Sequence, residues 1–158
     1  VLAVLTACQE LAVPFPVTGL LPLAENAISG AAYRPSDVIT QYGGTTVEIG
    51  NTDAEGRIVL ADALAYAATR LAPRAIIDIA TLTGHARIAL SRALAPVFGT
   101  SDPLVDALIA AGETTGETLW RMPLPTAYRA DLSSEVADLA HDDFDALEHV
   151  LAGLGNAL

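Results

Sequence analysis

The sequence of 158 residues contains no lysine, and its eight basic residues, all arginines, stand against 19 acidic residues. The formal net charge at pH 7 is therefore −11. A nucleic-acid-binding domain normally carries a patch or stripe of clustered basic residues. The arginines show no such cluster, so no nucleic-acid partner is expected. The acidity is instead typical of a soluble protein of the cytoplasm.

Cysteines and long apolar runs are also scarce. The single cysteine, Cys8, excludes an internal disulfide and favours a reducing compartment. Because it lies within an apolar helical pattern, we expect Cys8 to be a core residue. No apolar run approaches the roughly 18 residues that a membrane-spanning helix needs. The chain opens at Val1 inside an apolar periodic pattern, so we expect it to be part of a longer protein.

What the sequence does contain is enough apolar residues for a compact domain. Hydrophobic residues make up 52% of the chain, and the mean hydropathy is +0.43. Apolar spacing and the placement of proline predict helices over 1–11, 51–72, 101–117 and 144–158. Strands are predicted at 17–23, on both sides of Gly43-Gly44 within 37–51, and at 74–84. This alternation predicts an α/β fold with a mixed, mainly parallel sheet flanked by helices.

The stretch NTDAEGR, residues 51–57, places Asp53, Glu55 and Arg57 at every second position. One interpretation is a capping box, with Thr52 as the N-cap of a helix and Glu55 three residues later. Capping does not explain Arg57, because the helix dipole disfavours a positive charge in the first turns. A second interpretation is that an extended segment projects all three side chains to one side. Two converging carboxylates would then need a divalent cation between them, and an arginine beside it would hold an anion.

The longer stretch NTDAEGRIVLADAL resembles the signature of the leucine aminopeptidases, the cytosol aminopeptidase family (peptidase family M17). Further resemblances occur along the chain in the order GLLPLAEN, SGAAYRPSDV, AIIDIATLTG, GETLWRMPL and SEVADL. Together they cover Val1 to about Leu139, whereas residues 140–158 depart from the family pattern. The resemblance implies that residues 1–158 are a partial catalytic domain without the family's N-terminal regulatory domain.

The same resemblance implies a chemistry. Family members release N-terminal, preferentially apolar, amino acids from peptides by using two divalent ions, usually zinc, manganese or magnesium. Asp53 resembles a metal ligand, and Glu55 resembles the carboxylate that bridges the two ions. Arg57 resembles the catalytic arginine that holds a bicarbonate-like anion, which acts as the proton shuttle. A cytoplasmic homo-hexamer with active sites facing an interior cavity is also implied for the full-length protein.

The predicted strand 74–84 ends in TLTG, where ligands bind in open α/β sheets. The resemblance implies that Thr81, Leu82 and Gly84 contact the substrate, whereas an ordinary strand-to-helix turn is the alternative. No sequence signal predicts a phosphate-binding loop, since YGGTTVE leads into a strand rather than a helix.

The family's remaining site residues come from a segment upstream of the position that corresponds to Val1: a metal-binding lysine, two aspartates and a second, catalytic lysine. Because this sequence has no lysine, we expect the chain alone to bind one metal ion weakly and to lack two-metal hydrolysis. The alternative function is that of a non-catalytic relative, a structural or binding subunit. The run 141–143, His-Asp-Asp, has the composition of a metal cluster. Because consecutive residues rarely bind one ion, we expect it to be an acidic lead-in to a helix.

Overall fold

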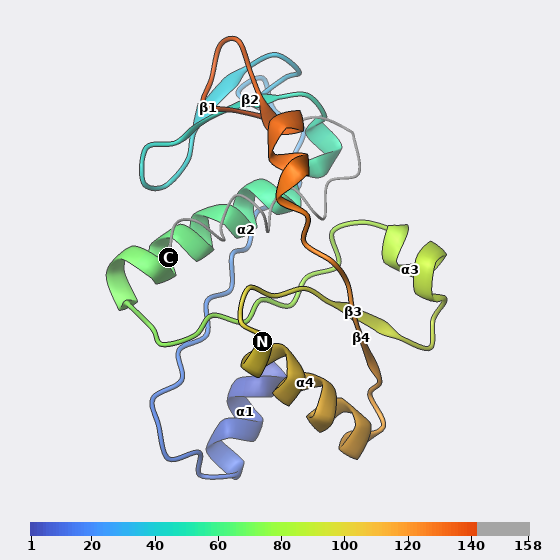
Figure 1. Ribbon diagram of the computed structural model, residues 1–158. Coiled ribbons are helices and arrows are strands. Elements are labelled where there is room, and N and C mark those ends of the chain that lie inside the picture. Colours follow the sequence, from blue (N-terminus) through green and yellow to red (C-terminus); the bar gives the residue numbers. More distant parts are fainter. Residues whose placement is uncertain (142–158) are drawn as a thin grey trace.

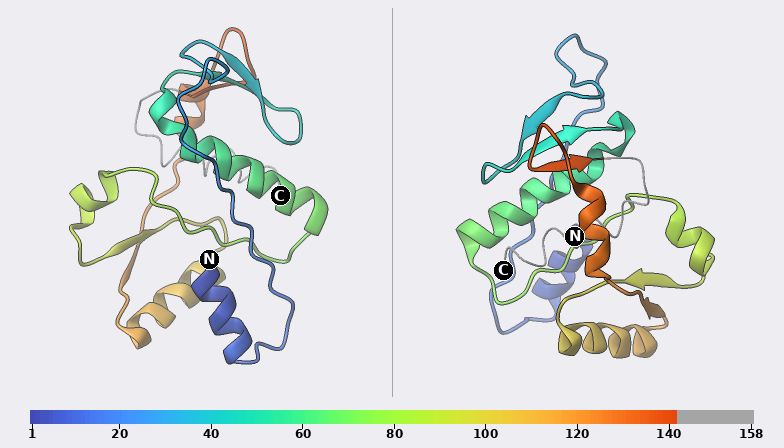
Figure 2. Two further views of the ribbon diagram at one scale, coloured as in Figure 1. Left: turned by 180° about the vertical axis from the view of Figure 1, so that it is seen from behind. Right: turned by 45° about the horizontal axis from the view of Figure 1, so that its top comes forward.

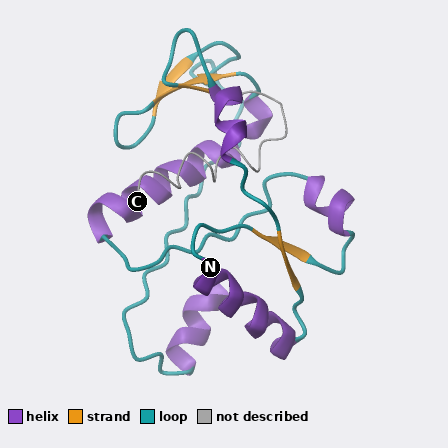
Figure 3. Cartoon of the chain, in the orientation of Figure 1, coloured by secondary structure: helices purple, strands orange, loops and turns teal. Residues whose placement is uncertain are grey.

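The computed structural model describes residues 1–141, so the helix predicted at 144–158 lies outside the described residues. Helices and short strands alternate along the chain (Figure 1, Figure 3). The elements are α1 (Leu2–Glu10), β1 (Val38–Thr40), β2 (Thr46–Ile49), the 3-10 turn η1 (Thr52–Ala54), α2 (Glu55–Tyr66), the π-helical η2 (Ala67–Leu71), α3 (His85–Leu90), β3 (Ala95–Val97), α4 (Asp102–Thr115), β4 (Leu119–Arg121), the 3-10 helix η3 (Thr126–Leu132) and β5 (Leu139–His141).

The sheet β1-β2-β5 and helix α2 lie at one end of the molecule, and α1 and α4 lie at the other (Figure 1, Figure 2). The strand pair β3-β4 and helix α3 occupy the side between them (Figure 1). The segment between α1 and β1 runs between the two ends without forming a helix or strand. In the part of the chain that the structure describes, no helix is both long enough and apolar enough to cross a membrane.

The predicted hairpin about Gly43-Gly44 is confirmed. Strands β1 and β2 pair antiparallel, and the two glycines have φ values of +99° and +100°, a conformation that costs glycine little. Along β2, Val47 and Ile49 are buried, whereas the alternating residues Thr46 and Glu48 are half-buried on the opposite face. A hydrogen bond links the turn of the hairpin to α2: the backbone N–H of Tyr42 donates to a carboxylate oxygen of Asp62 at 2.8 Å.

Within residues 1–141, two of the three strand pairings are parallel, in agreement with the predicted α/β fold. Strand β5 runs parallel to β2, and β3 runs parallel to β4. Helix α4 connects β3 to β4, which makes a strand–helix–strand unit. The helix predicted over 101–117 is confirmed, with Ser101 as its N-cap and Pro103 in its first turn; it ends at Thr115, and Gly116 is the C-cap.

Two predicted strands are wrong. Residues 17–23 and 74–84 form no strand, and their apolar side chains face solvent, with Leu23 88%, Ile77 55% and Ile79 62% exposed. An inner parallel strand needs a hydrogen-bonding strand on each side and a covering layer on each face. Neither segment has a strand beside it within residues 1–141.

The prediction that Cys8 is a core residue is also wrong. Cys8 is half-buried, and none of the residues of α1 is fully buried.

Candidate metal site

Residues 51–57, called the acidic turn below, lie at the edge of the sheet where two parallel strands both end. Strand β2 ends at Ile49, which pairs with His141, the last residue of β5. The N–H of Gly50 then donates to the carbonyl oxygen of His141 at 2.6 Å. Residues 51–57 follow directly and make the turn η1 and the start of α2 (Figure 1). The polar residues of the motif are therefore at the sheet edge where open α/β folds bind ligands.

The capping arrangement differs from the capping box that the sequence suggested. The side-chain oxygen of Asn51, rather than that of Thr52, accepts the hydrogen bond that caps η1, from the N–H of Asp53 at 2.8 Å. Glu55 is the first residue of α2 instead of the fourth position of a capping box. The turn is tighter than a simple helix start, because a 3-10 segment precedes the α-helix.

The extended conformation considered for residues 53–57 is not adopted either. Asp53 lies in η1, whereas Glu55 and Arg57 lie in α2, and helical residues two positions apart do not share a face. Asp53 and Glu55 are exposed, and Arg57 is half-buried. The backbone therefore presents the two carboxylates to solvent and directs Arg57 elsewhere on the helix.

As metal donors, Asp53 and Glu55 fit a divalent cation in chemical type, since such ions take carboxylate oxygens. They provide only part of a ligand set. No group of three or more His, Cys, Asp or Glu residues within 1–141 is arranged to hold a metal ion. Asp53 and Glu55 are accordingly two exposed carboxylates at this edge, and their metal role stays a prediction.

Tyr33 is a neighbour of this turn that the sequence did not single out. Its side chain is half-buried, and burial, followed by the negative charge of Glu55, raises the pKa of the phenol above its usual value. The phenol is therefore within electrostatic reach of Glu55 and stays protonated at neutral pH. No local sequence signal would have found it, because a loop residue and a helix start are brought together only by the fold.

The loop that carries Thr81, Leu82 and Gly84 packs against the acidic turn. A β-carbon added at Gly56 would lie 2.9 Å from Cδ2 of Leu82. Glycine therefore allows this loop to approach the first turn of α2 closely. Thr81 and Gly84 are exposed, and Gly84 is the N-cap of α3. The fold thus places the predicted metal ligands and the predicted substrate loop side by side.

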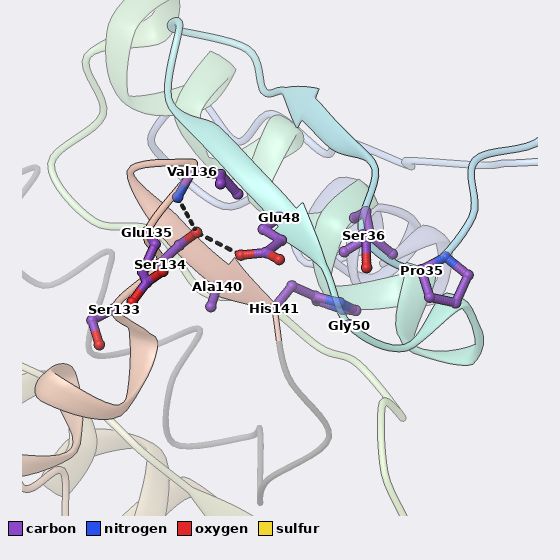
Figure 4. Close-up of a pocket in the computed structure, with 11 residues that line it drawn as sticks. Pro35, Ser36, Glu48, Gly50, Ser133, Ser134, Glu135, Val136, Ala140 and His141 are labelled. Atoms are coloured by element: carbon purple, nitrogen blue, oxygen red, sulfur yellow. Dashed lines mark hydrogen bonds between the residues drawn. The ribbon is translucent and has the colours of Figure 1, made fainter.

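A cavity of about 460 Å³ lies between the loop at Pro35-Ser36, the end of β2, residues 133–136 and the end of β5 (Figure 4). On its wall, the hydroxyl of Ser134 donates to Glu48 at 2.6 Å. His141 also lines it, is 5% exposed, and places Nε2 at 2.9 Å from the carbonyl oxygen of Ala54. His141 is thus a buried strand residue rather than a helix lead-in, and Asp142 and Asp143 lie outside the described residues.

Comparison with known proteins decides the family. The sequence of residues 1–154 matches the family model described as the cytosol aminopeptidase family, catalytic domain. The chain belongs to the cytosol aminopeptidase family. The fold agrees: a solved mutant of tomato leucine aminopeptidase superposes with a TM-score of 0.70 at 46% sequence identity, over 73% of this chain and 23% of that one.

Two curated bacterial relatives carry the name probable cytosol aminopeptidase. The Micrococcus luteus protein is 55% identical over 141 residues, which is 89% of this chain and 27% of the relative. The Chlorobium limicola protein is 48% identical over 141 residues, again 89% of this chain and 28% of the relative. This member of the cytosol aminopeptidase family therefore spans little more than a quarter of the length of the relatives it matches.

Proposed function

We propose that the chain supplies part of the active site of a divalent-metal aminopeptidase that releases N-terminal, preferentially apolar, amino acids from peptides. The observation that carries this proposal is the juxtaposition at the edge of β2 and β5. There the turn that holds Asp53 and Glu55 follows the strands directly, and the loop at Leu82 packs on Gly56 within the same turn. Family membership supplies the reaction class.

In this proposal each side chain has a separate task. Asp53 and Glu55 would hold divalent ions such as zinc, manganese or magnesium, with Glu55 proposed as the ligand common to two ions. Bound ions would supply Lewis acidity toward the peptide carbonyl. The planar guanidinium of Arg57 would hold a bicarbonate-like anion, which would supply general-base chemistry.

The substrate is held by the neighbouring loop. Leu82 offers an apolar wall to the first side chain of the peptide, which favours apolar residues at that position. Thr81 and Gly84 are exposed beside it and offer polar backbone groups to the peptide. The proposed full-length protein is a cytoplasmic homo-hexamer.

A second candidate function is that of a non-catalytic structural or binding subunit. The small ligand set favours it: two carboxylates at the strand edge and a sequence without lysine. The two candidates differ in whether the acidic turn binds a divalent ion at all.

The test is a Mn²⁺ titration of the 158-residue chain, followed by the electron paramagnetic resonance signal of free Mn²⁺. We expect weak binding that is lost in Asp53→Asn and in Glu55→Gln. The control Glu113→Gln removes an exposed carboxylate from α4 and is expected to leave the titration unchanged. Equal binding by all four proteins would refute the metal role of the turn.

Hydrolysis of leucine-p-nitroanilide with added Mn²⁺ or Zn²⁺ provides the second measurement. We expect no turnover by the 158-residue chain alone, because two carboxylates do not complete a two-metal site. Clear metal-dependent turnover that is lost in Glu55→Gln would show that the chain needs no further ligands.

A further inference from the structure

We propose that His141 is a positioning residue for the acidic turn: it binds both ends of residues 50–54 and thereby fixes the carboxylates of Asp53 and Glu55 for a divalent ion. The inference rests on the proposed metal role of those two carboxylates. It assigns a function to a buried histidine that lies 87 residues away from the turn in sequence.

The side chain of His141 makes a directional contact inside the protein. It is 5% exposed, and its Nε2 lies 2.9 Å from the carbonyl oxygen of Ala54. A carbonyl oxygen can only accept, so Nε2 must carry the proton in this contact. Ala54 stands between Asp53 and Glu55, at the junction of η1 and α2. The bond therefore fixes the peptide unit between Ala54 and Glu55, next to both predicted ligands.

The main chain of His141 fixes the other end of the same turn. Its carbonyl oxygen accepts from the N–H of Gly50 at 2.6 Å. One residue thus contacts the turn at Gly50 and at Ala54, on either side of Asp53. A single contact would leave the turn free to pivot, whereas two contacts from one buried residue fix its orientation.

Strand β5, which carries His141, and the residues just before it make several hydrogen bonds to β2. Asp138 accepts from the N–H of Thr46 at 2.9 Å and from its hydroxyl at 2.7 Å, and the N–H of Asp138 donates to the same hydroxyl at 3.0 Å. Ser134 bonds to Glu48 (Figure 4), and β5 pairs with β2 up to His141. His141 is therefore held by a rigid strand and does not merely follow the turn.

Residues that orient metal ligands without touching the metal strongly affect affinity, and their loss typically weakens metal binding by roughly 10- to 100-fold. Removing the imidazole also leaves the Ala54 carbonyl without this bond. We therefore expect His141→Ala to weaken Mn²⁺ binding by about tenfold or more, through its hydrogen bond to the backbone of the turn.

Two further variants separate positioning from general stability. His141→Gln keeps an amide N–H that reaches the Ala54 carbonyl and is expected to restore most of the Mn²⁺ affinity. Leu139→Ala removes a half-buried side chain from the same strand without touching the turn. It is expected to lower the free energy of unfolding while leaving Mn²⁺ affinity within twofold.

A measurement without metal completes the test. Hydrogen exchange of the Asp53 amide, which donates to the Asn51 side chain, reports on the order of the turn. We expect faster exchange in His141→Ala, near wild-type exchange in His141→Gln, and no local change in Leu139→Ala.

The outcomes are distinguishable. Wild-type Mn²⁺ affinity and unchanged Asp53 exchange in His141→Ala would overturn the positioning role and leave the proposed function intact. Faster exchange with unchanged Mn²⁺ affinity would overturn the link to metal binding. If the wild-type chain binds no Mn²⁺, the proposed function fails, and Asp53 exchange alone then decides whether His141 holds the turn.

Discussion

Ile49 is the most deeply buried large side chain among the described residues, at 1% exposure, and it is the last residue of β2. Replacing it with alanine removes three carbons from a site with no solvent access. Such changes cost the lost transfer free energy plus that of the cavity left behind, typically 2–5 kcal/mol, and about 0.5–1.5 kcal/mol for Ile→Val. We place Ile49→Ala at about 3 kcal/mol and Ile49→Val at about 1 kcal/mol of lost stability.

The matched control is Ile79→Ala, the same substitution in a segment where the side chain is 62% exposed. A surface change of this kind shifts the free energy of unfolding by no more than about 0.5 kcal/mol. Urea unfolding of the three variants and the wild type, followed by circular dichroism, measures all the differences. An Ile79→Ala loss as large as that of Ile49→Ala would refute the reasoning, because it would mean that segment 74–84 is buried in solution.

Three other changes test the remaining contacts. The hydrogen bonds from Thr46 hold the pKa of Asp138 below its usual 3.8, so the stability that this carboxylate contributes is present above pH 3.8 and is lost as the pH falls through the lower folded value. Asp138→Asn should therefore destabilise the chain at pH 7 and much less at pH 2, and an equal loss at both pH values would contradict this. Gly56→Ala should displace the Leu82 side chain, seen as amide shift changes over residues 81–84, with less than about 1 kcal/mol change in stability because a flexible methyl can move. Arg57→Met should abolish any increase in Mn²⁺ affinity caused by bicarbonate while retaining Mn²⁺ binding without it; bicarbonate acting equally on both proteins would argue against the anion site.

The features that the sequence predicted correctly depend on local physics. Two adjacent glycines allow the positive φ values of the β1–β2 turn, and the alternation about Val47 and Ile49 fixes which face of β2 is buried. Helix α4 is bounded by a proline in its first turn and by Gly116 after its last. Each of these signals lies within a few residues of the structure that it determines.

The wrong predictions concern features that depend on distant partners. The run at 74–84 has the composition of an inner strand, yet a strand exists only where another strand supplies its hydrogen bonds. The sequence is compatible with either an extended or a helical conformation of residues 53–57. In the structure these residues are helical, and the side chain of Asn51 caps the turn η1 that begins the helical segment. The sequence draws attention to His141 only because two aspartates follow it. The role that we propose for His141 depends on its contact with Ala54, which no local pattern encodes.

The helical start of the acidic turn also changes the electrostatic requirements of the proposed site. The N-terminus of α2 carries a partial positive charge of roughly half a unit, which opposes a cation at the same place. Arg57 adds a full positive charge within the first turn. The negative charges of the two carboxylates therefore only just offset the charge of one divalent ion. The helix dipole and Arg57 then leave the net local charge positive. A second metal ion requires further anionic groups, and an anion bound at Arg57 meets part of that requirement. In the proposed site, a bicarbonate-like anion held by Arg57 would offset this positive balance, and the affinity would depend on the position of each carboxylate, which we propose that His141 fixes.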